Sequence, residues 1–382
     1  MATITENIQT LRSIKSDIKN AIIQKGGSVT DAFGTYAKAI TNLPSGGGGG
    51  TEIEDALVTR TLSGTYYNDR VSVVGQYAFY LCRSLTTINL TNCKSLDGCA
   101  LYYCSSLTSV NLPLCEYIGY GAFGQCSKLS SIDLPNCSYI GYGAFKLCEI
   151  LKTVNLPKCS YVDTGAFGQC SKLSYIDLPN CSYVGTSTFE SCESLQFVNL
   201  PNCTSLNETV FSRCYNLQSV NLPNCSYVGS SAFWACGLPS IELPNCSYIG
   251  GYAFYVCDKL SLTNLPNCSY IGGYAFYMCS SISIVRMPVC SYIGYGAFLS
   301  CSNLKEIYLN SVSNVTRIDS NTFYNCPKLT SIYVPASLVD AFKVAPNWSS
   351  ISDKIVVYRE IVGGDIDMGG GIPDDGGDIE ID

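Results

Sequence analysis

The stretch that decides the fold is residues 117–138, YIGYGAFGQCSKLSSIDLPNCS, because residues 139–160, YIGYGAFKLCEILKTVNLPKCS, repeat it closely. A phenylalanine, or once a leucine, recurs in each unit at steps of 22 residues, apart from one step of 21 and a last one of 25. A repeat this short cannot enclose a core, so its apolar residues must pack against those of the next unit. The sequence therefore predicts a repeat solenoid of about twelve coils of 22 residues. The recurring positions are Phe79, Leu101, Phe123, Phe145, Phe167, Phe189, Phe211, Phe233, Phe254, Phe276, Phe298 and Phe323.

The second half of each unit predicts a short strand. After Leu129, the apolar residues Ile132 and Leu134 alternate with polar residues. Pro135 follows and cannot continue a ladder of hydrogen bonds. We expect successive copies of this strand to pair as a parallel sheet. The Ile-Gly pair that follows predicts a second short inward contact, and the A-F-x-x-C segment predicts a single helical or 3₁₀ turn.

Cysteine recurs twice in each unit. A small, weakly polar side chain at two fixed positions suits the narrow interior of a solenoid, because a free cysteine packs as a compact hydrophobe. Zinc or iron–sulfur ligation is the alternative, but it requires closely spaced ligand pairs, and the chain has no histidine. We expect packing, with no metal and no cofactor. The first column is Cys82, Cys104, Cys126, Cys148, Cys170, Cys192, Cys214, Cys236, Cys257, Cys279, Cys301 and Cys326; the second is Cys93, Cys115, Cys137, Cys159, Cys181, Cys203, Cys225, Cys246, Cys268 and Cys290; only Cys99 falls outside.

The unit I-G-x-x-A-F-x-x-C-x-x-L-x-x-I-x-L-P, over about residues 72–336, resembles the BspA-like class of leucine-rich repeats. This class is found in bacterial surface proteins and in gut bacteriophage proteins. The resemblance implies a binding solenoid with a parallel sheet face and no catalytic residues. The second cysteine column departs from the family, which usually has a polar or β-branched residue there.

The segments around the repeats predict two caps. We assign residues 52–336 to the solenoid with an N-terminal cap, in which residues 56–70 form a short hairpin. Residues 337–361 resemble the closing segment of the family, with Ser337 as a helix N-cap and with Phe342 and Trp348 packed on the last coil. Residues 362–382 are rich in glycine and acidic residues, and we expect disorder or a further docking strand there.

The N-terminal 43 residues predict a helical hairpin for attachment or oligomerisation. Apolar residues lie at helical spacing, and so short a hairpin must bury its apolar stripe against other virion proteins or against its own copies in a homo-oligomer. Residues 44–51 form a glycine-rich linker. This arrangement looks like the start of tail and fibre-associated bacteriophage proteins. The attachment residues are Ile4, Ile8, Leu11, Ile18 and Ile22.

The composition disfavours nucleic-acid binding, a membrane span and catalysis. A net charge of −7 disfavours nucleic-acid binding. The sequence contains no run of about eighteen apolar residues, the length that a membrane span requires. Without histidine, serine and cysteine nucleophiles lack their usual base. Asp133 and Asp177 could pair in a glycosidase, but two coils put them roughly 10 Å apart on an open face, which favours solvated polar positions instead.

The outward side of the predicted strands carries the candidate ligand-binding patch. Tyr175 and Phe197 occupy positions where most other units have serine or threonine, although Leu262 and Ile284 also fall in this column, and they lie beside a column of Asn and Asp. Exposed aromatic rings next to hydrogen-bonding groups suit sugar stacking or a protein hot spot, although the polar column alone is explained by solvation. The recurring tyrosines before Ile-Gly form a second stripe that favours mutual stacking over binding. The patch comprises Asn155, Tyr175, Asp177, Phe197, Asn199, Asn221 and Glu242.

Three functions fit these patterns to different degrees. The first is a non-enzymatic bacteriophage virion component, tail or fibre associated and made in the host cytoplasm, that recognises a glycan or protein on the host surface. It is favoured because the N-terminus, MATITENIQTLRSIK, has no secretory signal. The alternative is a bacterial cell-surface adhesin of the BspA-like class. A glycan-active enzyme ranks last, since the repeats contain almost no insertion that could build a pocket.

Overall fold

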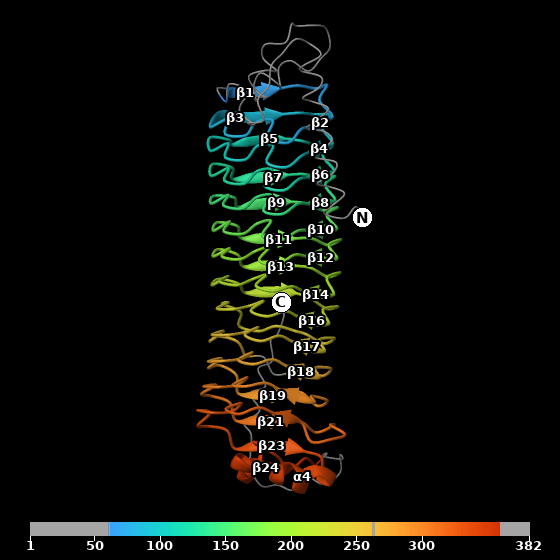
Figure 1. Cartoon of the computed structure of the whole chain (residues 1–382), viewed down its shortest axis with the longest axis vertical. Coiled ribbons are helices and arrows are strands. Elements are labelled where there is room, and N and C mark those ends of the chain that lie inside the picture. Colours follow the sequence, from blue (N-terminus) through green and yellow to red (C-terminus); the bar gives the residue numbers. More distant parts are fainter. Residues whose placement is uncertain (1–59, 61, 262–263, 360–382) are drawn as a thin grey trace, which may run out of the picture.

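The computed structural model describes residues 60, 62–261 and 264–359, which form one long stack of coils (Figure 1). The solenoid has about 13 turns, one more than the twelve expected. The expected N-terminal helical module with its five attachment residues, the linker 44–51 and the acidic tail 362–382 lie outside the described residues.

One side of the stack, called here the strand face, carries the L-x-x-I-x-L strands. The prediction of parallel pairing is confirmed, but the face is divided into the sheets β1-β3-β5, β7-β9, β11-β13-β15 and β19-β21-β23-β24. The strands are β1 (Ser63–Tyr67), β3 (Ser84–Asn89), β5 (Ser109–Asn111), β7 (Ser131–Asp133), β9 (Thr153–Asn155), β11 (Tyr175–Asp177), β13 (Phe197–Asn199), β15 (Ser219–Asn221), β19 (Ile284–Arg286), β21 (Glu306–Tyr308), β23 (Ser331–Val334) and β24 (Ile355–Val357).

The first strand explains the additional turn. β1 pairs in parallel with β3, with Tyr66 opposite Ile88, and it precedes the first aromatic position, Phe79. Residues 63–67 were expected to belong to a hairpin cap. They continue the solenoid by one strand instead, because their side chains follow the same inward and outward alternation as the next coil, and Tyr66 is buried.

The Tyr-Ile pairs form one continuous sheet of twelve strands, the tyrosine sheet, seen along one edge of the stack in Figure 1. Each strand has two residues, of which the second is buried. The sequence predicted only an inward contact here. The strands are β2 (Val73–Val74), β4 (Ser95–Leu96), β6 (Tyr117–Ile118), β8 (Tyr139–Ile140), β10 (Tyr161–Val162), β12 (Tyr183–Val184), β14 (Ser205–Leu206), β16 (Tyr227–Val228), β17 (Tyr248–Ile249), β18 (Tyr270–Ile271), β20 (Tyr292–Ile293) and β22 (Arg317–Ile318).

The A-F-x-x-C segments, for example residues 119–126 and 207–214, form a third side called here the turn edge. They are successive turns and not the expected helical turn. The N–H of Phe123 donates to the carbonyl of Ala144 in the next coil at 2.7 Å, whereas the N–H of Gly124 donates back to Gly121 at 3.0 Å. Gly121 and Gln125 have φ of 57° and 60°, so alternate N–H groups point at the neighbouring coil and cannot continue a helix.

The phenylalanine column lies at the centre of the core. The rings of Phe123 and Phe145 are stacked with centroids 5.1 Å apart, and the same arrangement continues coil by coil to Phe323. These spacings match the roughly 4.8 Å between neighbouring strands. Positions 22 residues apart therefore lie directly above one another, as the repeat predicted.

Both cysteine columns are buried, and all 23 cysteines are free thiols. Each thiol of the first column, from Cys104 onward, donates to a backbone carbonyl oxygen in the preceding coil. The acceptor is the core phenylalanine of that coil, or Leu101 in the one coil that has leucine there. Cys148 Sγ lies 3.1 Å from the Phe123 oxygen, which also accepts the N–H of Cys126 at 3.1 Å. In the second column the bond stays within the coil, as from Cys137 Sγ to the Tyr139 oxygen at 3.3 Å. The cysteines supply hydrogen bonds as well as volume.

The C-terminal end closes the stack with η1 (Ala336–Leu338), α4 (Val339–Val344), η2 (Ser349–Lys354) and β24. Phe342 and Trp348 are buried there, and Trp348 Nε1 donates to the Thr316 carbonyl at 2.6 Å. The prediction that Ser337 is an N-cap is wrong. The 3₁₀ turn already begins after Pro335, whose extended ψ of 141° ends the preceding strand, so Ser337 lies inside the turn.

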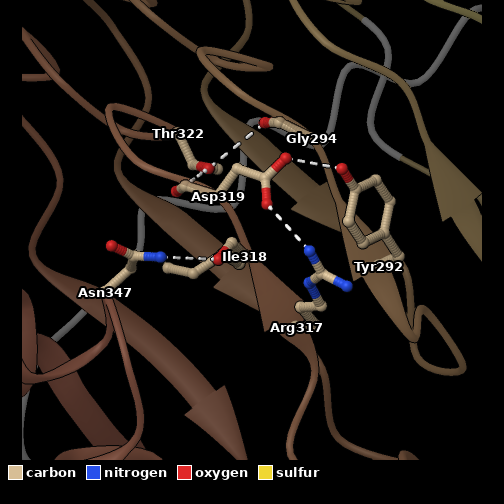
Figure 2. Close-up of polar contacts among 7 residues, drawn as sticks. All are labelled: Tyr292, Gly294, Arg317, Ile318, Asp319, Thr322 and Asn347. Carbon is tan, nitrogen blue, oxygen red and sulfur yellow. Dashed lines mark hydrogen bonds and ion pairs between the residues drawn. The ribbon is translucent and has the colours of Figure 1, made fainter.

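Polar contacts attach the last coil to its neighbours (Figure 2). Asp319 accepts a hydrogen bond from the Tyr292 hydroxyl at 2.5 Å and pairs with Arg317 at 3.7 Å. Asn347 Nδ2 donates to the Ile318 carbonyl at 2.9 Å, which connects the C-terminal cap to the end of β22.

Truncation of one stacked ring tests the phenylalanine column. Phe167→Ala should lower the free energy of unfolding by about 3–5 kcal/mol, because it leaves a cavity between two rings. Phe197→Ala, at a position that is 47% exposed, should change it by less than about 0.5 kcal/mol. Urea unfolding followed by circular dichroism measures both values, and equal losses would contradict the stacking.

The buried thiols predict unfolding at alkaline pH. Burial, with the neighbouring thiols second, raises the pKa of Cys115, Cys181 and Cys225 to about 12, while thiols of an unfolded chain ionise near pH 8.5. The folded protein thus keeps protons that the unfolded chain loses. The free energy of unfolding is unaffected below about pH 8.5 and falls above it, by about 1.4 kcal/mol per pH unit for each such thiol.

Because many column thiols contribute, we expect cooperative unfolding between about pH 9 and 10.5. In this range their summed decrease in the free energy of unfolding exceeds the about 5–15 kcal/mol by which folded proteins are usually stable. Circular dichroism against pH, with reductant present, should show the transition and its reversal on return to pH 7. A native signal retained at pH 11 would contradict it.

Candidate functional site

The structure brings the two exposed aromatic residues of the predicted patch together. Tyr175 on β11 lies opposite Phe197 on β13, and Ser219 on β15 follows in the same register. The side chains of Tyr175 and Phe197 are 49% and 47% exposed. Parallel strands put residues of equal position on the same face, so Tyr175 and Phe197 form an apolar step between Thr153 and Ser219 of the neighbouring coils.

The polar residues beside this pair are hydrogen-bonded to one another. Asn199 Nδ2 donates to Asp177 Oδ1 at 2.8 Å, and Asn221 Nδ2 donates to Asn199 Oδ1 at 2.7 Å. Each amide thereby uses one N–H to bind the preceding coil. One oxygen of Asp177 and the second N–H of each amide are not used in this ladder. Asp177 and Asn199 lie on the same strands as Tyr175 and Phe197, two residues further along.

Two predicted residues do not join this cluster. Asn155 belongs to the separate pair β7-β9, where its amide donates to Asp133 at 2.8 Å. Glu242 is exposed but lies in no strand, because its coil is one residue shorter and contains Pro239. The shortened loop brings the backbone so close that a Cβ at Gly237 would lie 2.0 Å from the Tyr215 carbonyl oxygen. The sheet β11-β13-β15 therefore ends before Glu242.

The tyrosines of the tyrosine sheet stack on one another as the sequence favoured. Tyr117, Tyr139 and Tyr161 have ring centroids about 5 Å apart, at 4.9 and 5.1 Å, and a second run begins at Tyr227. Each ring covers the next, which reduces the aromatic surface open to a ligand.

A second aromatic cluster, on the turn edge, was missed by the sequence analysis. Tyr252 stacks on Tyr274 with centroids 5.2 Å apart, Tyr255 stacks on Tyr277 at 4.7 Å, and Trp234 lies beside Tyr255. The signal was present in G-x-x-A-F-x, whose variable positions hold aromatic residues in consecutive coils.

Across the described part of the chain, no group of three or more Cys, Asp or Glu side chains is arranged to hold a metal ion. The helices of residues 60–359 that are described include none of sufficient length and hydrophobicity to span a bilayer.

The Asn and Asp ladder predicts a measurable loss of stability. Asn199→Ala removes a donor to Asp177 and an acceptor for Asn221, and should lower the free energy of unfolding by about 1–3 kcal/mol. Asn155→Ala removes one such bond, at the edge of a two-stranded sheet, and should cost about half as much. Urea unfolding of both variants provides the comparison; a larger loss for Asn155→Ala would speak against the ladder.

Several solved structures are similar to this chain. A leucine-rich repeat protein from Bacteroides ovatus is 23% identical, with 76% of this chain and 88% of that chain covered and a TM-score of 0.44. A leucine rich cell surface protein from Faecalibacterium prausnitzii is 22% identical over 76% and 82%, with a TM-score of 0.40. The pneumococcal vaccine antigen PcpA is 19% identical over 78% and 85%, with a TM-score of 0.42. These likenesses concern the fold alone, and no curated protein matches the chain.

The family described as BspA type leucine rich repeat region (6 copies) matches residues 59–172, 116–239 and 226–344. These matches together span residues 59–344 and include the strand face except β24, the tyrosine sheet and the turn edge. The chain therefore belongs to the BspA-type leucine-rich repeat family.

Proposed function

We propose that this chain is a non-enzymatic recognition protein of a bacterial cell surface, whose solenoid binds a glycan or a protein partner through the strand-face patch at Tyr175 and Phe197. The observation that carries the proposal is the in-register pair of half-exposed rings bordered by the ladder of Asp177 and Asn199. Proteins of this family are generally non-enzymatic binding proteins.

The chemistry of the patch suits adhesion. Adjacent aromatic rings offer a large apolar area that loses little side-chain entropy on binding. The ladder holds its amides in one orientation, so the remaining polar groups of Asp177 and Asn199 are preorganised for a partner. An aromatic centre with a polar rim is the composition of binding hot spots.

A bacterial surface is a better-supported setting than the virion that the N-terminal segments suggested. The virion expectation rests on residues 1–43 and the glycine linker, which lie outside the described residues. The family match rests on the solenoid itself, and the F. prausnitzii protein of similar fold is named as a cell-surface protein. The buried thiols are compatible with this setting, because burial raises the pKa of, for example, Cys181 to about 12 and disfavours the reactive thiolate.

Removal of the two rings tests the proposal. The full chain and its Tyr175→Ala/Phe197→Ala variant are compared on glycan arrays and on intact gut bacterial and epithelial cells. The variant should bind at least about tenfold more weakly, because both rings lie at the centre of the patch, and its unfolding transition should be unchanged.

A matched double variant, Tyr142→Ala/Tyr324→Ala, removes two rings that are 56% and 68% exposed elsewhere on the solenoid and should bind like the original chain. Binding that is reduced equally by both double variants, or by neither, would overturn the assignment of the patch.

A further inference from the structure

The turn edge contains a hollow of about 430 Å³. This volume falls within the range of about 300–1,000 Å³ that is usual for small-molecule sites. The hollow spans the coils of Phe189 to Phe254, on a different side of the coils from the Tyr175 and Phe197 patch. Its lining residues are Glu190, Thr209, Ser212, Ser231, Trp234, Tyr252 and Tyr255.

The hollow follows from the residue sizes in one column. The position after each core phenylalanine is Glu190, Ser212, Trp234 and Tyr255 in four consecutive coils. Because these coils stack in register, the short side chain of Ser212 lies between the longer Glu190 and Trp234. A serine between two large residues leaves space above it.

Ser212 has an unusual environment. Its side chain is 1% exposed, and its hydroxyl is the one buried side-chain oxygen or nitrogen in the described residues that has no hydrogen-bond partner. A buried hydroxyl without a partner costs about 1–3 kcal/mol. Ser212 lines the hollow, and its backbone is already bonded within the turn edge. A ligand in the hollow is therefore a partner that the hydroxyl reaches by rotating about χ1.

The aromatic residues form a wall on one side. The Trp234 and Tyr255 centroids are 6.3 Å apart with planes at 47°, and Tyr252 and Tyr255 are 5.6 Å apart at 49°. Arg213, which does not line the hollow, lies 4.9 Å from the Trp234 centroid and holds the indole in place. The rings touch one another, so they leave no space between them for a quaternary ammonium group, and the nearby guanidinium disfavours a cation.

The other side of the hollow is polar. Glu190 offers carboxylate oxygens and takes part in no ion pair among the described residues. Thr209 and Ser231 line the space as well, and the Thr209 hydroxyl already bonds Ser187 at 2.7 Å. One apolar wall facing hydrogen-bonding groups matches a pyranose ring, which has an apolar C–H face and a rim of hydroxyls. The carboxylate disfavours an anionic sugar.

We propose that this hollow is a binding subsite for one pyranose ring of an uncharged saccharide. The C–H face of the ring packs against the aromatic wall of Trp234, Tyr252 and Tyr255, and its hydroxyls bond Ser212 Oγ and the Glu190 carboxylate. The subsite is independent of the strand-face patch and goes beyond it, since it fixes a ligand class and a second side of the coils.

Fluorescence provides a direct test, because the chain has two tryptophans and Trp348 is only 1% exposed. The full chain is titrated with the methyl glycosides of glucose, galactose, mannose and N-acetylglucosamine, and with glucuronate. At least one uncharged glycoside should shift the emission and protect Trp234 from acrylamide quenching, and glucuronate should not. In Trp234→Phe the shift should disappear, and the affinity by calorimetry should fall about tenfold.

The Ser212→Ala variant distinguishes an effect on ligand affinity from an effect on stability. Loss of one hydrogen bond to a buried group should weaken the binding of the responding glycoside by about tenfold. The urea midpoint should stay equal or rise, because an unpartnered buried hydroxyl is removed. The Tyr142→Ala/Tyr324→Ala variant, which changes neither the lining of the hollow nor the strand-face patch, serves as the control and should bind the glycoside unchanged. The strand-face patch is judged separately by the cell and array binding of Tyr175→Ala/Phe197→Ala, so its failure and failure of this subsite give different results.

The proposal is overturned if none of the uncharged glycosides changes the Trp234 signal at high millimolar concentration, in which case the hydroxyl binds water only. It is also overturned if Ser212→Ala keeps full affinity, or if glucuronate binds as well as the uncharged sugars.

Discussion

The stacking of each coil on the next is the constraint on which the rest of the structure depends. A 22-residue unit has no interior of its own, so its buried side chains must have the same size and place as those above and below. The ring centroids of the phenylalanine column, 5.1 Å apart at Phe123 and 5.7 Å at Phe323, show how closely this requirement follows the spacing of hydrogen-bonded strands. Backbone bonds between coils and side-chain contacts between coils are therefore satisfied by the same spacing, and neither can change without the other.

The choice of cysteine follows from that spacing. The carbonyl of Phe123 points along the stack and accepts two bonds, one from Cys126 N–H and one from Cys148 Sγ. Valine would fill the same volume without a donor, and serine would leave part of the space empty and cost more to remove from water. Cysteine meets both demands in a space too narrow for a larger polar group. The consequence is a core whose stability depends on thiols that stay protonated.

The sequence predicts the buried columns and the place of the strands, because the period alone sets which side chains meet. It predicts the pairing of Tyr175 with Phe197 for the same reason, since the two residues are 22 positions apart. It does not predict features that depend on geometry between coils. The turn edge looked helical because its apolar spacing suits one turn, yet the positive φ at Gln125 turns alternate N–H groups toward the next coil. The strand face is interrupted where one residue is missing near Pro239, and Glu242 is lost from the patch there.

The candidate binding residues share one property, which is departure from the residues that their neighbouring coils carry. Asn199 and Asn221 follow the column, and their amides are consumed in bonds to adjacent coils. Tyr175 and Phe197 replace serine or threonine and so project from the face, whereas Ser212 is small between Glu190 and Trp234 and so leaves a hollow. A regular column satisfies its own contacts, and only a break in size or polarity between stacked coils leaves a group without a partner. Recognition in such a solenoid must therefore arise from differences between coils, because the repeated residues are already bonded to one another.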